Sequence, residues 1–468
     1  MDLVAQVNNN FCERQIARHV FRAYDIRGIV NEELDGDAYY TIGRAVATHL
    51  QSTRKIFIAR DGRLTSEYLA NALIQGLLNS NVDVIDLGAV ATPVMYFATH
   101  IGVTDCGLMV TGSHNPANYN GIKIVLFGKT LIQNDIDNLY NLIIKGDFPN
   151  GKGQLTQHNI LPQYIQRILQ DIKLQRQLKV VVDCGNGIAG ITIPKVLTAL
   201  GCHVIPLFCE VDGNFPNHHP DPTDAKNLID LQREVIAQQA DIGLAFDGDA
   251  DRLGVVTNIA DIIWPDRLMM YYAQHILTTL PGATIVFDVK CSRNLAKIIQ
   301  AAGGISQMCP TGHSIVKSIM KQANAALAGE MSGHLFFKDR WYGFDDALYS
   351  ACRLLELITQ SPQTVAMQFN AIPDSINTPE IKIPITDAEK FIFIEKLYKI
   401  AQFANGEIIT IDGIRVEFDD GWGLLRASNT TPYLIARFEA TTVHSLERIK
   451  QLFREQMLKV DQNLIVNF

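Results

Sequence analysis

The chain has 468 residues, which at roughly 100–200 residues per domain predicts about three or four domains. Hydrophobic residues make up 47% and charged residues 19%, which excludes a largely disordered or fibrous protein. The 41 basic residues against 49 acidic ones give a formal net charge of −8, the wrong sign for a general nucleic-acid or acidic-membrane binder. An anionic small molecule is still compatible, provided that basic residues cluster locally.

The start of the chain has no basic segment followed by an apolar core, so we expect no secretory signal. No stretch approaches the roughly 18–20 apolar residues that a membrane-spanning helix needs. The eight cysteines are scattered without a CxxC pair, and Cys202 and Cys209 lie in apolar runs that favour buried free thiols. We therefore predict a cytoplasmic protein without a nucleic-acid or membrane partner.

The first pattern of strand, helix and strand begins at residue 55. Residues 55–59 form a short apolar run, residues 67–78 are helical in pattern, and residues 82–88 form a second run. The same order returns twice, at residues 178–185, 193–200 and 202–207, and at residues 283–288, 293–302 and 304–308. Each copy is typical of a βαβ unit with a buried, mostly parallel sheet.

A third strand follows in each copy, and the residues after it are unusual. The strands at residues 107–110, 242–246 and 325–328 are followed by TGSHNP, DGDADR and GEMSGH respectively. In α/β sheets, functional crevices lie beyond the carboxyl ends of the strands. We therefore expect three related α/β domains with mixed, mostly parallel sheets that direct these loops into one central cleft.

The last hundred residues have a different pattern. Five strand-like stretches, at residues 380–385, 406–412, 415–418, 422–426 and 433–439, precede a helical stretch at 443–460. This pattern predicts a C-terminal α+β domain with an antiparallel sheet. The predicted domains are residues 1–158, 159–260, 261–373 and 374–468.

Asp247, Asp249 and Asp251 alternate along the chain directly after a buried strand. On an extended segment, alternate side chains project to the same side, so the three carboxylates are expected to converge. Hard oxygen ligands at this density suit Mg²⁺, with Ca²⁺ or Mn²⁺ as alternatives. An EF-hand is excluded because Arg252 stands where its glycine is required, and an acidic surface turn is the remaining alternative.

Ser113 lies between Gly112 and His114 at the exit of the corresponding strand of the first copy. The hydroxyl could simply satisfy loop backbone groups, but its place matches that of the aspartate loop in the next copy. A serine facing a divalent cation is suited to carrying a phosphoryl group whose oxygens bind the metal. The sequence contains neither a GxSxG elbow nor a P-loop, which disfavours hydrolase and nucleoside-triphosphatase activities.

A basic and polar loop, RASNTTP, begins at Arg426 in the last domain. An arginine can bind a phosphate through two nitrogens, and hydroxyl, amide and backbone N–H groups can complete an anion site. A polar hairpin loop is the alternative interpretation.

With these motifs, the chain resembles the α-D-phosphohexomutases, and most of all the bacterial phosphomannomutase/phosphoglucomutase group. The resemblance extends from Phe21-Arg22-Ala23-Tyr24-Asp25-Ile26-Arg27-Gly28 to the final domain. It rests on the ordered set TGSHNP, DGDADR, GEMSGH and RASNTTP, which is far more specific than any one of the four. The family has four domains around a central cleft, in agreement with the repeats.

The resemblance implies a role for each matching position. Ser113 would be the phosphoserine, and its phosphate with Asp247, Asp249 and Asp251 would bind one Mg²⁺ ion. Glu330 and Ser332 would bind the 3- and 4-hydroxyls of the sugar. The phosphate that does not react would be bound by Arg426, Ser428, Asn429 and Thr430. Further positions around the substrate would be Tyr24, Arg27, Lys123, Arg252, Lys290 and His313, with a core aromatic as the alternative for Tyr24.

The resemblance also implies the reaction. The phosphoserine would convert a hexose 1-phosphate, or a 6-phosphate, into a 1,6-bisphosphate, which turns over and returns its other phosphate to Ser113. Because a phosphoserine adds roughly −1.5 to −2 charges beside three carboxylates, Lys123, Arg252 and His114 are expected to balance the charge together with Mg²⁺. Lys123 and His313 are both candidates for the general base, and Arg27 is counted with the catalytic residues.

Several alternatives stay open at this point. A phosphoglucosamine mutase is the nearest, although Met331 replaces the glutamine common in that group and favours mannose and glucose. A metal-dependent phosphatase and a catalytically silent phosphosugar-binding protein are the others. The expected partners are phosphosugars, with the bisphosphate as activator, and we expect a monomer, with a dimer as the alternative.

Overall fold

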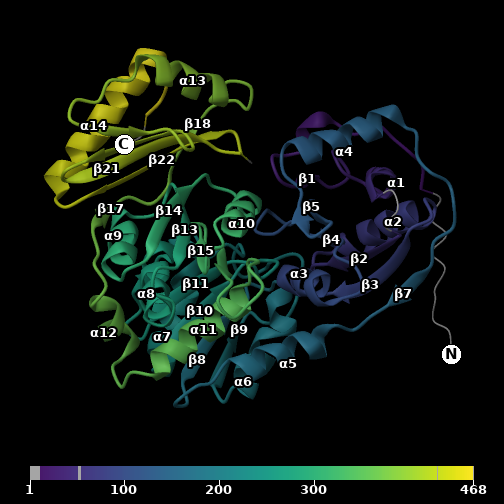
Figure 1. Cartoon of the computed structure of the whole chain (residues 1–468), viewed down its shortest axis with the longest axis horizontal. Coiled ribbons are helices and arrows are strands. Elements are labelled where there is room, and N and C mark those ends of the chain that lie inside the picture. Colours follow the sequence, from purple (N-terminus) through teal and green to yellow (C-terminus); the bar gives the residue numbers. More distant parts are fainter. Residues whose placement is uncertain (1–10, 51–53, 430, 467) are drawn as a thin grey trace. The chain divides into compact units, whose positions relative to one another are not determined.

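The computed structural model describes residues 11–50, 54–429, 431–466 and 468 (Figure 1). Its contacts group the chain into two compact units. Unit 1 comprises residues 1–263 and 332–366, and unit 2 comprises residues 264–331 and 367–468. No helix among the described residues is long and apolar enough to cross a membrane.

Unit 1 begins with a mixed sheet whose strands run in the order β1-β5-β4-β2-β3-β7, with β6 paired to β5. Its central strands β4, β2 and β3 are parallel, and β5 is antiparallel to its neighbours. The strands are β1 (Ile26–Ile29), β2 (Lys55–Arg60), β3 (Asp83–Ala89), β4 (Gly107–Val110), β5 (Tyr119–Leu126), β6 (Lys129–Thr130) and β7 (Leu155–Gln157). The helices of this region are α1 (Gly36–Leu50), α2 (Ser66–Leu78), α3 (Thr92–Ile101) and α4 (Asn134–Lys145).

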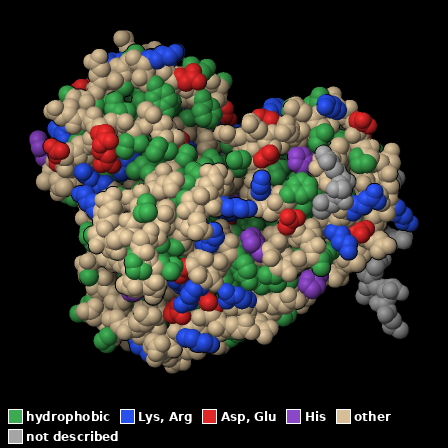
Figure 2. Space-filling model, viewed as in Figure 1, with side chains coloured by type: hydrophobic (Ala, Val, Ile, Leu, Met, Phe, Trp, Pro, Cys, Tyr) green, Lys and Arg blue, Asp and Glu red, His purple; other side chains and the backbone are tan. Residues whose placement is uncertain are grey.

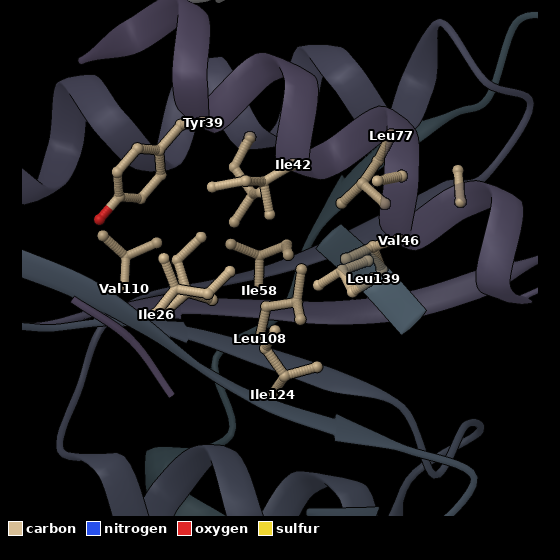
Figure 3. Close-up of a cluster of buried hydrophobic side chains, with 14 of the residues drawn as sticks. Ile26, Tyr39, Ile42, Val46, Ile58, Leu77, Leu108, Val110, Ile124 and Leu139 are labelled. Atoms are coloured by element: carbon tan, nitrogen blue, oxygen red, sulfur yellow. The ribbon is translucent and has the colours of Figure 1, made fainter. Parts of the chain in front are cut away.

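The core of this region lies between the sheet and helices α1, α2 and α4. Figure 3 shows Tyr39, Ile42 and Val46 of α1 facing Ile58 of β2 and Leu108 of β4, all of them buried. A Cβ on Gly43 of α1 would lie 2.5 Å from a backbone oxygen of α2, so these two helices pack at backbone contact. Burial on both faces explains the continuous apolar run of β2.

The second sheet of unit 1 has the order β12-β11-β10-β8-β9, in which β10, β8 and β9 are parallel and β11 and β12 are antiparallel. Its strands are β8 (Lys179–Asp183), β9 (His203–Leu207), β10 (Ile242–Phe246), β11 (Leu253–Thr257) and β12 (Ile262–Ile263). The helices that follow or flank these strands are α5 (Leu161–Asp171), α6 (Ile193–Ala199), α7 (Ile229–Gln238) and α11 (Ala347–Thr359). Unit 1 also contains β16 (Leu335–Phe337).

Unit 2 contains a parallel arrangement in the order β14-β13-β15. These strands are β13 (Thr284–Asp288), β14 (Ile305–Cys309) and β15 (Leu327–Gly329), and the helices are α8 (Pro265–Thr279), α9 (Arg293–Ala301) and α10 (His313–Gln322). In all three sheets the first strand of a repeat pairs with both the second and the third, as in β4-β2-β3 and β10-β8-β9. This equivalence confirms the three related α/β folds predicted from the sequence.

The end of the chain forms an antiparallel sheet in the order β17-β22-β21-β20-β19, with β18 also paired to β22. The strands are β17 (Ile376–Asn377), β18 (Ile381–Pro384), β19 (Glu407–Ile409), β20 (Ile414–Phe418), β21 (Gly421–Ala427) and β22 (Tyr433–Ala440). Helices α13 (Lys390–Ile400) and α14 (Val443–Val460) pack on it, while the short α12 (Val365–Asn370) precedes it. The predicted α+β pattern is confirmed.

The surface carries charged side chains of both signs. Lys and Arg side chains are interspersed with Asp and Glu side chains over the face shown in Figure 2.

Candidate active site

Ser113 lies in the loop that follows β4, and its side chain is buried. Its backbone adopts φ +48°, a left-handed conformation that is strained for a residue with a Cβ. The Thr111 hydroxyl accepts a hydrogen bond from the Ser113 N–H at 2.8 Å and so supports this conformation. Strain of this kind is typical of a residue whose position serves chemistry rather than packing.

Arg63, which the sequence analysis did not identify, holds the serine loop in place. Its guanidinium donates to the backbone oxygens of Ser113 (2.7 Å), Asn115 (2.6 Å), Pro116 (2.6 Å) and Tyr119 (3.1 Å). Arg63 follows β2 at a sheet edge shared with the end of β4, because these strands are parallel neighbours. The only signal for Arg63 in the sequence was its position two residues after Asp61, which follows the first strand of the repeat.

The three aspartates follow β10 and converge, but for a different reason from the one predicted. The segment is a turn rather than an extended strand, with Ala250 at φ +62° and its N–H bonded to the Asp247 carbonyl at 3.1 Å. The N–H groups of Asp251 and Arg252 donate to Asp247 Oδ1 at 3.0 and 3.1 Å. The turn brings one oxygen from each carboxylate to within 4.8 Å of the others, a group that could hold a metal ion.

The serine and aspartate loops are in direct contact. Ser113 Oγ lies 3.2 Å from Asp247 Oδ2, and a Cβ on Gly248 would lie 2.4 Å from the Ser113 carbonyl oxygen. Residue 248 must therefore be a glycine for the loops to approach this closely. Thr92 adds a second link, since its hydroxyl donates to Asp249 Oδ2 at 2.5 Å and its N–H to the Asp249 carbonyl at 3.0 Å.

The electrostatics of the aspartates suit a divalent cation. Burial and the charges of Asp249 and Asp251 raise the pKa of Asp247 well above its usual range. Within the described part of the chain, Oδ1 of Asp249 and Oδ1 of Asp251 are buried and accept no hydrogen bond. Buried carboxylate oxygens without donors are the ligands that Mg²⁺ prefers, so the residues fit this ion.

Lys123 projects from β5 into the same group of carboxylates. Its Nζ lies 2.6 Å from Asp249 Oδ2 and also contacts Asp251 Oδ2. Burial alone would lower the pKa of Lys123, but Asp249 and Asp251 raise it well above its usual value. Conversely, burial raises the pKa of Asp249, yet the Lys123 charge lowers it overall. Lys123 is therefore a permanent positive charge in this arrangement.

His114 and Arg27 also contact residues of the serine loop. His114 Nδ1 is 3.2 Å from Ser113 Oγ, and burial followed by the charges of Arg252 and Arg27 lowers the pKa of this imidazole well below its usual value. The neutral ring can exchange a hydrogen bond with the hydroxyl. Arg27 in β1 bonds Asn115 Oδ1 and Asp25 Oδ2, each at 2.5 Å, and is thereby fixed beside the serine loop.

His334 is a second residue that was not predicted as part of the site. Its Nδ1 lies 3.4 Å from Asp251 Oδ1 and 3.2 Å from Asp345 Oδ2, and its Nε2 is 3.2 Å from Arg252 Nε. With Asp251 and Asp345 it forms a further group with the spacing of metal ligands. His334 ends the GEMSGH motif, so the motif itself carried the signal.

In unit 2, the residues expected to bind substrate form a connected set. Glu330 Oε1 accepts the Gly312 N–H at 2.6 Å, beside buried His313 at the start of α10. Asp412 Oδ2 accepts from Arg426 Nε at 2.9 Å and from the Thr311 N–H at 3.0 Å, which links the arginine to the loop before His313.

Of the remaining predicted residues, Lys290 and Ser428 have defined contacts, and the others are described at most by their burial. Lys290 Nζ pairs with Glu380 Oε1 at 2.6 Å. The Ser428 hydroxyl bonds that of Thr431 at 2.7 Å, while Asn429 is half-buried and Thr430 lies outside the described residues. Tyr24 and Ser332 are half-buried in bends or turns of unit 1.

The comparisons with known proteins agree with this arrangement. Four sequence profiles match in order: phosphoglucomutase/phosphomannomutase alpha/beta/alpha domains I, II and III over residues 18–150, 162–259 and 264–375, and the C-terminal domain over residues 380–456. The fold and the profiles together define a phosphohexomutase, an isomerase that moves a phosphoryl group within a sugar phosphate. The chain belongs to the phosphoglucomutase/phosphomannomutase family.

Three relatives illustrate this membership. The chain is 52% identical to the phosphomannomutase/phosphoglucomutase of Pseudomonas aeruginosa, over 96% of this chain and 97% of that protein. It is 47% identical to a phosphoglucomutase of Neisseria meningitidis, over 96% and 99%. The crystal structure of a phosphoglucomutase/phosphomannomutase family protein from Burkholderia thailandensis is 46% identical, with a TM-score of 0.92 over 97% of this chain and 100% of that one.

Proposed function

We propose that this enzyme interconverts the 1- and 6-phosphates of mannose and of glucose through a phosphoserine at Ser113 and a hexose 1,6-bisphosphate. The observation that supports this proposal most strongly is the 3.2 Å distance between Ser113 Oγ and Asp247 Oδ2, within a buried acidic triad. A hydroxyl in that position can carry a phosphoryl group whose oxygens face a cation.

The metal assigned to this site is one Mg²⁺ ion per chain, held by Asp247, Asp249, Asp251 and the phosphate on Ser113. When bound, Mg²⁺ supplies positive charge that offsets the phosphoryl oxygens and the carboxylates. Lys123 and Arg252 supply the remaining positive charge, and His114 orients the serine oxygen. Phosphoryl transfer depends mainly on such positioning and neutralisation.

A general base must accept the proton of the attacking sugar hydroxyl. Lys123, whose Nζ lies 2.6 Å from Asp249 Oδ2, is one candidate for this base. Among the imidazoles, His114 faces Ser113 Oγ at 3.2 Å, and His313 and His334 are the other candidates. Of these, His334 has the direct connection to the metal loop, through Asp251 at 3.4 Å.

The sugar and its second phosphate are assigned to the other motif residues. We infer that Glu330 and Ser332 bind the 3- and 4-hydroxyls, which lie near the axis about which the bisphosphate must turn. The passive phosphate is assigned to the loop that begins at Arg426, a set comprising Arg426, Ser428, Asn429 and Thr430. Tyr24, Arg27 and Lys290 complete the proposed binding site, and the bisphosphate acts as activator by restoring the phosphoserine.

The choice of sugar is supported by the names of the relatives. The Pseudomonas protein is named for both mannose and glucose, and the Neisseria protein for glucose. Only the 2-hydroxyl distinguishes these sugars, and none of the motifs contains an evident contact to it. We therefore propose dual use. Coupled assays on the 1-phosphates of mannose, glucose and glucosamine distinguish this proposal from a phosphoglucosamine mutase.

We further propose four functional domains, with boundaries near residues 158, 260 and 373. We also propose that the enzyme acts as a monomer and that it works in the cytoplasm. Its eight cysteines are all free thiols, the usual state in a reducing compartment.

Ser113→Ala tests the central assignment. We expect mutase activity to fall below about 10⁻³ of the wild-type rate, because the assigned phosphoryl carrier is removed, and we expect the phosphate detected by intact-mass measurement to disappear. Ser80→Ala is the matched control, since its buried hydroxyl bonds the carbonyl of Gly76 within α2.

Three outcomes would count against the proposed function. Full turnover in Ser113→Ala would contradict the assignment of Ser113 as the phosphoserine. Release of inorganic phosphate in place of the isomer would identify a phosphatase, and an intact but inactive wild-type protein would identify a binding protein.

A further inference from the structure

Two cysteine thiols lie side by side at one edge of the second sheet of unit 1. Cys184 directly follows β8, and Cys209 follows β9 by two residues. The strands are parallel neighbours, and the Cys184 N–H donates to the Leu207 carbonyl at 3.1 Å. As a result the two Sγ atoms are only 3.4 Å apart.

The two thiols differ in exposure and in pKa, as the attacking and resolving thiols of a reactive pair do. Cys184 is fully buried, whereas Cys209, expected from the sequence to be buried, is partly exposed. The hydrogen bond between the thiols lowers the pKa of Cys209, and burial raises the pKa of Cys184 well above its usual value. Cys209, the more exposed residue of the pair, is therefore the better candidate for the nucleophile, and Cys184 for the resolving thiol 3.4 Å away.

We propose that Cys184 and Cys209 form a reversible disulfide that lowers mutase activity, with a small-molecule disulfide such as oxidised glutathione as the oxidant. The Cys209 thiolate attacks one sulfur of the oxidant, forms a mixed disulfide and releases one thiolate. The Cys184 thiol loses its proton to that thiolate, attacks the Cys209 sulfur and displaces the second thiolate. Both cysteines are oxidised, and the small disulfide is reduced to one thiol and one thiolate, which takes up the proton that Cys209 released on ionising.

The Cys184 side of this pair is connected to the metal loop. The turn that begins at Cys184 has two successive left-handed residues, Gly185 at φ +49° and Asn186 at φ +58°. The Ile188 N–H then donates to the Gly248 carbonyl at 3.1 Å. A Cβ on Gly187 would lie 2.9 Å from the same oxygen, so the turn has no space in which to move independently of the aspartates.

The Cys209 side is connected to the serine loop. A Cβ on Gly62 would lie 2.2 Å from Val211 Cγ1, so the segment after Cys209 packs on the turn that carries Arg63. The Arg63 guanidinium also lies over the Phe215 ring at 5.0 Å. Closing the sulfurs from 3.4 Å to the about 2.05 Å of a disulfide pulls on both connections. Displacements of this size at supports of a catalytic site cost activity.

The test uses the full-length protein incubated over a range of ratios of reduced to oxidised glutathione. Differential alkylation and peptide mass analysis measure the Cys184–Cys209 link, and mutase assays on the same samples measure activity. We expect the disulfide to form, activity to fall on the order of tenfold, and a reductant to restore it. Cys209→Ala and Cys184→Ser should lack both effects, whereas Cys12→Ser, which removes an exposed thiol, should behave as the wild type.

The two readouts separate the possible failures. A glutathione adduct at Cys209 without a link to Cys184, or no modification at any ratio, would overturn the disulfide itself. A disulfide that leaves activity unchanged would overturn its regulatory role. Loss of activity that persists in Cys209→Ala would assign inhibition to another cysteine. The mass readout does not depend on the proposed reaction.

Discussion

Ser113 is held in a left-handed backbone conformation at φ +48°, which costs on the order of 1–3 kcal/mol for a residue other than glycine. Hydrogen bonds from Arg63 to the loop carbonyls and from the Ser113 N–H to Thr111 offset that cost. The result is a hydroxyl directed at Asp247 at 3.2 Å. The conformation is thus part of how the loop presents its oxygen to the aspartates.

Thr92 allows the support of the metal ligands to be tested at a single hydroxyl. Its Oγ1 donates to Asp249 Oδ2 at 2.5 Å, and hydrogen bonds to charged groups contribute about 1.5–3 kcal/mol. In Thr92→Val the carboxylate loses this donor while the side chain keeps its shape. We expect the Mg²⁺ concentration for half-maximal activity to rise about tenfold, as measured by titrating the chelated enzyme with Mg²⁺.

Thr99→Val provides the matched control for this experiment. Thr99 is a buried residue of the same helix, but its hydroxyl donates to the Tyr96 carbonyl within α3. Equal responses of the two variants would show that the effect comes from the helix rather than from Asp249.

At the scale of the element, Arg63 determines the shape of the serine loop through four carbonyl contacts. A lysine keeps the charge but cannot donate in four directions. We therefore expect Arg63→Lys to reduce kcat/KM on the order of 10²-fold, since small displacements of a reacting group have effects of this size. Steady-state kinetics measure the change, and thermal unfolding distinguishes it from loss of fold.

Arg60→Lys is the control. Arg60 is the last residue of β2, the strand that precedes Arg63, but it pairs at 3.4 Å with Glu67, whose side chain is exposed. If Arg60→Lys and Arg63→Lys lost activity equally, the loop contacts would not be the cause.

Asp346 is the N-cap residue of helix α11, and the ionisation of its carboxyl group affects stability. It accepts from the Tyr349 N–H and the Tyr164 hydroxyl at 2.9 Å and from Trp341 Nε1 at 3.2 Å. Burial outweighs these donors and raises the pKa of Asp346 from 3.8 to about 7. The folded state binds the proton of Asp346 more tightly than the unfolded state does, so protonation of this carboxyl stabilises the fold. That contribution to the free energy of unfolding is complete below about pH 4 and is lost as the pH rises through about 7.

Asp346→Asn removes this titration. We expect the free energy of unfolding of the wild type minus that of Asp346→Asn to be larger at pH 4 than at pH 8, by up to about 4 kcal/mol. Urea unfolding at several pH values measures the difference. A constant difference across this range would mean that the carboxyl titrates normally in the folded protein.

The sequence predicted the repeated elements well because their signal is local. Strands β2, β8 and β13 are buried on both faces, so their apolar runs are visible without knowledge of the fold. The predicted strand at residues 406–412 is shorter in the structure, Glu407–Ile409, because its pairing with β20 ends there. Convergence of the aspartates was predicted, but the turn with Ala250 in a left-handed conformation was not.

Arg63 and Thr92 could not be assigned from their local sequence, and His334 was visible only as the last residue of the GEMSGH motif. Each acts on residues far along the chain, as Thr92 does on Asp249. Such contacts depend on how the sheets pack, which hydrophobic periodicity does not encode. The ordered motifs identified the family nonetheless, because they specify the chemistry of each loop independently of its supports.

At the scale of the whole molecule, the chain forms two compact units, and the acidic triad with its supports belongs entirely to unit 1. A ligand that binds only the folded state stabilises the structure around its own site. We expect Mg²⁺ to slow hydrogen exchange in β4, β10 and the loops that follow them. We expect no change in β20 and β21 of unit 2. Exchange followed by mass spectrometry, with and without a chelator, measures both.

Asp247→Asn provides the control for this last experiment, because it removes one ligand and keeps the side-chain volume. In this variant the response of β4 and β10 to Mg²⁺ should disappear, while exchange without the cation should stay close to that of the wild type. The reason is that the three aspartates and Ser113 come from two loops, so a cation among them adds a further connection between two sheets that Thr92, Lys123 and Gly248 also join. A response of equal size in β20 and β21 would contradict a site confined to unit 1.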